Sequence, residues 1–245
     1  MRLSLNPNDF AKDPVMIAKH RLGLSATLVL ALAAAGFSSS AAAAGNPLDN
    51  VGIEHNAYLG CLMADESQPP SLQLLVSRCG YRPQGSVEDF IKTFQPYMPT
   101  SASLSYSQRI EPYRSQFTAA EYAFVKRIEA ALSPQAQSPE EIDRALAALE
   151  AQALAQLGDK SQGARGILAS LSVARHSLQF WTPYYIDRLE DSHAKLPKWL
   201  RVVIKVVTVV ATDAAVGAIL GSIPITAPAA GPAAGAASGV VAKEM

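Results

Sequence analysis

The carboxy-terminal run from Lys195 to Val241 is the feature that most constrains what this chain can fold into. It opens with basic and apolar residues, continues as a valine-rich run and ends as an alanine- and glycine-rich run. Pro224 and Pro228 separate the two halves, because proline disfavours helical conformation at the residue before it. The sequence therefore predicts a helical hairpin, with one arm from about residue 197 to 221 and another from about 228 to 242.

The first arm combines positive charge with an aromatic residue at its start. Lys198, Arg201 and Lys205 share one helical face, and Trp199 begins a neighbouring apolar stripe. Such a helix is typical of segments that seek a membrane surface or a partner protein. We interpret Lys198, Trp199, Arg201 and Lys205 as contact residues for membrane lipid or a partner.

Glycines recur at intervals of four in both arms. These glycines are Gly217, Gly221, Gly231, Gly235 and Gly239. Small residues at this spacing form a flat groove in which two helix backbones approach closely. We expect these glycines to mediate helix packing, with the hairpin packing against itself, against the rest of the protein or against a membrane.

The first arm also has the length of a membrane span. Residues 202–223 are about as long as the stretch of roughly 20 residues that a bilayer requires. Asp213 lies in the middle of this run, where a carboxylate costs about 2.5–3.5 kcal/mol on insertion scales. The sequence leaves two interpretations open, a hairpin buried in a soluble helical protein and a hairpin that associates with a membrane.

The amino terminus has the organisation of a secretory signal. Basic residues at positions 19–21 precede an apolar run over 22–37, and small residues follow at 41–45. We predict that residues 1–44 are a signal peptide cleaved after Ala44, with translation starting at the first residue or at Met16. The mature chain is then expected in the periplasm or outside the cell, with membrane association as one option.

The two cysteines, Cys61 and Cys79, both lie in the predicted mature chain. In an oxidising compartment an even cysteine count favours a disulfide, and two free buried thiols are the alternative. The loop that such a bridge closes corresponds to about 3 kcal/mol in the chain-entropy description.

The remaining sequence predicts helices throughout, and no stretch alternates with period two for long enough to indicate a strand. Helices are expected at about 51–64, 71–79, 86–95, 104–110, 118–132, 138–158 and 161–189. Pro183 should bend or break the last of these. The predicted fold is all-α, an irregular helical bundle over residues 45–195 followed by the hairpin over residues 196–245.

No pattern of residues predicts catalysis. His55, His176 and His193 have no metal-ligand spacing, and neither a nucleophile elbow nor a phosphate-binding loop occurs. His55 and Asn56 are expected to form a buried polar pair. We therefore expect no enzyme activity, no metal and no cofactor, and we identify no small-molecule substrate. The balance of 21 basic and 21 acidic residues gives no basis for nucleic-acid binding.

Two short segments carry a family resemblance. The run from Asn46 through Asp49 and Gly52 to His55 and Asn56 resembles the N-P-x-D-x-x-G-x-x-H-N start of a group of exported bacterial proteins of unknown function. Those proteins are also similar in having a Gly/Ala-rich carboxy-terminal segment after an Asp-Ala pair, here at residues 213–214. The resemblance implies an exported helical protein and no catalytic residues.

The sequence thus predicts a non-enzymatic exported helical protein whose carboxy-terminal hairpin serves self-packing or membrane association. Two alternatives remain, a soluble periplasmic binding or interaction module and a bacteriocin-like membrane-active effector. Membrane lipid or a second copy of the chain is the expected partner.

Overall fold

The computed structural model describes residues 45–245 except for 65–66, 100, 134–137, 190–195 and 225. The described residues contain helices and no strand, so the predicted all-α class is confirmed. The α-helices are α1 (Asp49–Met63), α2 (Leu72–Ser77), α3 (Val87–Phe94), α4 (Tyr106–Ile110), α5 (Ala119–Ala131), α6 (Pro139–Leu157), α7 (Gln162–Arg188), α8 (Lys198–Gly221) and α9 (Ala230–Glu244). Short 3-10 turns occupy Gln95–Tyr97, Glu111–Gln116 and Ala227–Ala229. The predicted signal peptide, its cleavage point and His193 lie outside the described residues.

Local sequence signals set the helix ends. The side chains of Thr118 and Ser138 each accept a hydrogen bond from the backbone N–H three residues on. The glutamate at that position in turn accepts one from the backbone N–H of the cap residue. These are the reciprocal caps of helices α5 and α6. Gly158 ends α6 with φ of 65°, a left-handed conformation that glycine adopts without steric cost.

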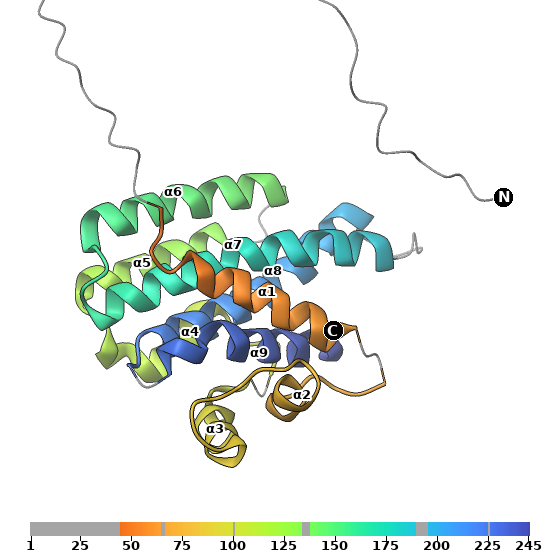
Figure 1. Cartoon of the computed structure of the whole chain (residues 1–245). Helices are drawn as coiled ribbons and strands as arrows, with labels where there is room; N and C mark the ends of the chain where they lie inside the picture. Colours follow the sequence, from red (N-terminus) through yellow and green to blue (C-terminus); the bar gives the residue numbers. More distant parts are fainter. Residues whose placement is uncertain (1–44, 65–66, 100, 134–137, 190–195, 225) are drawn as a thin grey trace, which may run out of the picture. The chain divides into compact units, whose positions relative to one another are not determined.

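Helix α7 is the centre of the bundle. It packs against α8 over most of its length and also contacts α1, α5, α6 and α9 (Figure 1). Its first half is buried on almost every side, from Ile167 to Ala174. Helices α2 and α3 lie at the periphery and reach this core through α1 and α9.

Pro183 does not end α7, which continues to Arg188. Proline removes one backbone hydrogen bond and commonly interrupts a helix. Here Trp181 and Tyr185, on either side of it, are 0% and 6% exposed and pack with their rings stacked. Because these two large side chains are fixed in the core, their burial offsets the lost hydrogen bond.

The carboxy-terminal segment forms two helices, α8 and α9, joined by a short turn and in contact with each other. The two helices also form much of the core, since α8 packs on α7 and α9 packs on α1 (Figure 1). Residues 230–239 of α9 are all buried. The expected boundary at residue 195 therefore falls between α7 and α8, the two helices that share the most extensive contact.

The glycines of the hairpin face the rest of the protein, which is one of the three packing partners that the sequence left open. A Cβ at Gly221 would meet the side chain of Ala169 on α7, and one at Gly231 would lie 2.5 Å from the carbonyl oxygen of Val51 on α1. Gly217 likewise faces α7, and Gly235 faces α1. Missing side chains therefore let α8 approach α7 and α9 approach α1, rather than bringing the two arms of the hairpin together.

A buried carboxylate fixes the start of α7 against α5. Glu121 is 4% exposed, accepts hydrogen bonds from the Thr118 backbone and the Ser161 hydroxyl, and lies against Gly163. Burial acts to raise the pKa of Glu121, but hydrogen bonds from Ser161, Thr118 and the backbone of Ala164 outweigh it and lower that pKa.

Gly231→Ala should destabilise the protein by about 1–3 kcal/mol, because the new methyl group would collide with the α1 backbone. Gly60→Ala is the matched control in a helix, since its nearest neighbour, a ring carbon of Phe180, would be at 3.7 Å. That variant should be neutral or more stable by up to about 1 kcal/mol. Denaturant unfolding measures both, and equal stabilities would show that α9 and α1 are not in close contact.

Glu121→Gln should lower the free energy of unfolding at neutral pH by about 1–3 kcal/mol. A carboxyl whose pKa is lowered by folding stabilises the native state above its unfolded pKa, and that contribution is lost as the pH falls through the folded pKa. The difference in the free energy of unfolding between the wild type and the variant should therefore shrink as the pH falls below 4.5, the ordinary pKa of a glutamate. Urea unfolding across pH 3–7 would test this, and a pH-independent difference would contradict it.

Candidate functional site

The segment that carries the family resemblance docks α1 on α7. Asn46 donates from its side chain to the Leu168 carbonyl at 2.9 Å, and Asn56 donates to the His176 carbonyl at 2.7 Å. Between them the Gly52 N–H donates to the Ser172 hydroxyl at 3.0 Å. Only glycine fits at position 52, because a Cβ there would lie 2.6 Å from the Ser172 carbonyl oxygen.

The polar side of this contact continues across the surface to α6. His176 lies 3.0 Å from a carboxylate oxygen of Asp49, and Arg175 forms ion pairs with Glu150 at 2.6 Å and Asp143 at 3.3 Å. The guanidinium lies between these two carboxylates, which raise the pKa of Arg175 against the opposing effect of burial. These pairs tie α1, α6 and α7 together.

A buried polar cluster lies at the centre of the four core helices. The Asp213 Oδ2 atom on α8 accepts hydrogen bonds from the Ser177 hydroxyl at 2.5 Å and from the Ser238 hydroxyl at 2.8 Å. The Trp181 indole N–H is shared between the Ser238 hydroxyl at 3.0 Å and the same carboxylate oxygen at 3.3 Å. His55 Nε2, from α1, lies 3.5 Å from that oxygen. Helices α1, α7, α8 and α9 thus each contribute to one centre.

This cluster contains serine, histidine and aspartate, but its position rules out substrate contact in this conformation. His55, Ser177, Asp213 and Ser238 are each 0% exposed. Burial makes a carboxylate costly unless several donors surround it, and Asp213 has such donors. The arrangement fixes the register of the core helices.

No group of three or more histidine, cysteine, aspartate or glutamate side chains within the described ranges could hold a metal ion. Of the three histidines considered in the sequence as metal ligands, His55 and His176 lie on different helices, and each faces one aspartate. The expected buried polar pair of His55 and Asn56 is divided. His55 turns into the core, whereas Asn56 bonds the α7 backbone.

Cys61 and Cys79 form a disulfide, as the sequence predicted, with their Cα atoms 5.8 Å apart. The bridge joins the end of α1 to the segment after α2. It holds the peripheral helix pair α2 and α3 to the bundle.

The predicted contact residues of α8 differ in where they lie. Trp199 is 53% exposed, and the neighbouring Leu196 is also exposed. Lys198 and Arg201 are half-buried on the same first turns of α8. Lys205 instead donates to the Met245 carbonyl at 2.6 Å and lies over the Tyr185 ring, so it faces α7 and the chain end.

Sequence reasoning missed Ser177, Trp181 and Ser238 as partners of Asp213. A signal was available, because one acidic residue in the middle of an otherwise apolar helix needs buried donors wherever that helix packs. Nothing in the spacing of the sequence shows which serines supply them.

The comparisons with known proteins identify no relative. No protein-family model matches the chain, and no curated protein or solved structure is detectably similar to it. The functional argument therefore depends on the sequence and the geometry of this chain alone.

Asp213→Ala should lower the free energy of unfolding by about 3–5 kcal/mol, because it leaves the donors of α7 and α9 without their shared acceptor. Asp143→Ala is the control, since that carboxylate pairs with Arg175 at the surface with 35% of its side chain exposed. Its cost should stay below about 1 kcal/mol. Thermal and denaturant unfolding would report both, and similar small losses would contradict the structural role of the cluster.

Proposed function

We propose that this chain is an exported, non-enzymatic helical protein that attaches to an anionic membrane surface through the start of α8. The observation that carries the proposal is the contrast within α8. Its first turns present an exposed Trp199 beside basic residues, whereas the rest of the helix is committed to the protein core.

The buried part of α8 argues for attachment without insertion. Among the described residues α8 is the one helix long and apolar enough to cross a membrane, and 78% of its most apolar stretch is buried. Inserting it would expose Asp213 to lipid and would separate α8 from α7. In this proposal the hairpin is part of the protein core and does not insert into the membrane.

The start of α8 has the chemistry of an interfacial anchor. We define the α8 start surface as Leu196, Lys198, Trp199 and Arg201. Leu196 and Trp199 are 45% and 53% exposed, and a tryptophan ring is well suited to the boundary between lipid headgroups and acyl chains. Lys198 and Arg201 add positive charge, worth about 1 kcal/mol each close to an anionic membrane.

Export is proposed from the sequence of residues 1–44 and is supported by the disulfide, because such bridges persist in oxidising compartments. The absence of enzyme activity is supported by the burial of the cluster around Asp213, which leaves its serine and histidine side chains closed to substrate.

The purified protein should co-sediment with vesicles that contain phosphatidylglycerol and should bind phosphatidylcholine vesicles much more weakly. Trp199→Ala should weaken binding about tenfold, because the indole no longer enters the interface. Added salt should release the protein, since it screens the basic residues. Sedimentation and tryptophan emission together measure these effects.

Ile53→Ala provides the matched control. Ile53 lies on α1 and is 53% exposed, the same fraction as Trp199, but it belongs to another surface. This variant should bind as the wild type does. If the protein does not bind anionic vesicles at low salt, or if both variants bind them more weakly than the wild type by the same factor, attachment through the α8 start surface is wrong.

The second candidate is a soluble binding or interaction module in the same compartment. It is favoured by the burial of most of the hairpin in the core, so that the hairpin is part of one compact unit with the other described residues. Failure of the vesicle experiment, with a folded protein, would favour this alternative.

A further inference from the structure

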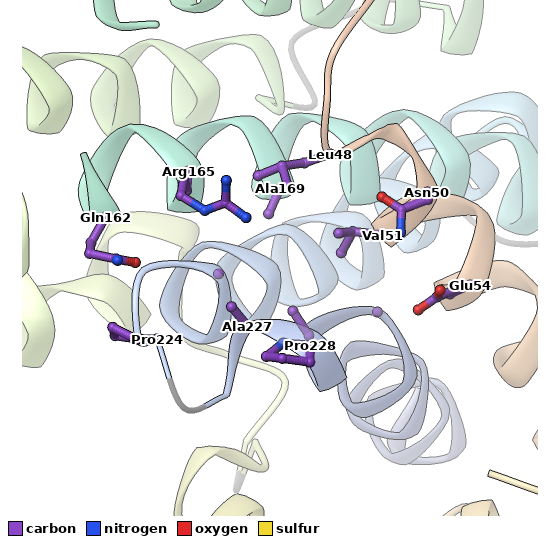
Figure 2. A pocket seen from close by; sticks show the side chains of 13 residues that line it. Leu48, Asn50, Val51, Glu54, Gln162, Arg165, Ala169, Pro224, Ala227 and Pro228 are labelled. Carbon is purple, nitrogen blue, oxygen red and sulfur yellow. The ribbon is translucent and has the colours of Figure 1, made fainter. Parts of the chain in front are cut away.

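A pocket of about 410 Å³ lies where α1, α7 and α9 begin and where α8 ends (Figure 2). Its volume is within the range of pockets that hold small molecules, roughly 300–1,000 Å³. Much of its wall consists of small residues, namely Ala169, Gly221, Ala227, Ala230 and Gly231. These residues have at most a methyl group, so the space between the helix ends stays open.

Four polar side chains surround this pocket from two helices. Asn50 and Glu54 come from α1, and Gln162 and Arg165 come from α7. Figure 2 shows the Arg165 guanidinium and the Glu54 carboxylate directed toward the pocket from opposite sides. Both side chains are half-buried. Within the described part of the chain neither side chain forms a hydrogen bond or an ion pair, unlike Arg175 on the same helix, which pairs with two carboxylates.

Arg165 and Glu54 place opposite charges on the two sides of the pocket. Arg165 stands in the first turn of α7, where the partial positive charge of a helix start adds to that of the guanidinium. Arginine binds a carboxylate through two parallel hydrogen bonds. Glu54 stands in the second turn of α1 and gives the opposite wall a negative charge. A ligand that satisfies both walls carries an anionic and a cationic group.

We propose that this pocket binds a small zwitterion of amino-acid or dipeptide size, with its carboxylate on Arg165 and its ammonium group on Glu54. The Asn50 and Gln162 amides can donate to and accept from the groups between the two charges. The alanine and glycine walls leave room for methyl-sized side chains, so alanine and alanylalanine are the probes of choice. This site is separate from the α8 start surface and does not depend on membrane attachment.

Titration calorimetry with alanine and alanylalanine on the full protein tests the proposal. At least one of the two should bind, and Arg165→Met should weaken that binding about tenfold or more, because a charged hydrogen-bond pair is lost. Arg82→Met is the control, since Arg82 is an exposed arginine that does not line the pocket and this variant should bind normally. Ala227→Leu should block the pocket by filling it.

Chemically modified probes test whether the Glu54 side of the pocket binds the ammonium group. N-acetyl-alanylalanine lacks the ammonium group and should bind about tenfold more weakly to the wild type, whereas Glu54→Gln should bind both probes with similar low affinity. Equal binding of the acetylated and free dipeptides would mean that the pocket takes a simple anion, which overturns the zwitterion assignment. No binding of either alanine probe, or unchanged binding by a folded Arg165→Met variant, would overturn the site itself. Helical circular dichroism and thermal unfolding of each variant would establish that it is folded.

Discussion

The structure depends on one buried carboxylate. Asp213 lies in the middle of α8 with no exposed surface and draws donors from α7 and α9, with His55 of α1 beside it. A carboxylate costs free energy in such a place unless its donors are all present, so a different register of any core helix would leave it without them. Apolar contacts alone tolerate small slips between helices, whereas this centre does not. The rest of the bundle is arranged around it.

The second constraint is how closely the backbones approach. At Gly231 and Gly235 the α9 helix meets the backbone of α1, and at Gly221 the α8 helix meets α7. Glycine in a helix costs about 1 kcal/mol relative to alanine in intrinsic propensity. A helix as rich in glycine as α9 is therefore stable through its packing and not through its own preference. The same packing keeps α8 away from lipid, and only its first turns remain for a partner or a membrane.

Local signals in the sequence predicted most of the fold. The caps at Thr118 and Ser138, the ends of α8 and the Cys61–Cys79 bridge follow from short-range chemistry, and the structure shows all of them. What the sequence could not give is which surfaces meet. The glycine spacing predicted that helices approach closely but not which helices meet. Burial of the side chains around Pro183 in the core lets α7 continue beyond that proline. The pocket between Arg165 and Glu54 also escaped prediction, because 110 positions separate the two residues in the chain while the fold places them on opposite sides of one pocket.

The pairing of the last helix with the first has a consequence for biogenesis. The inner face of α1 is covered by α9, and the hydroxyl of Ser238 that completes the centre belongs to the final residues of the chain. A ribosome makes α1 well before α9, so the face of α1 that α9 covers has no permanent cover until α9 has been made. The core therefore cannot close around α1 with the preceding helices alone, and α1 stays open to other apolar surfaces until α9 docks on it.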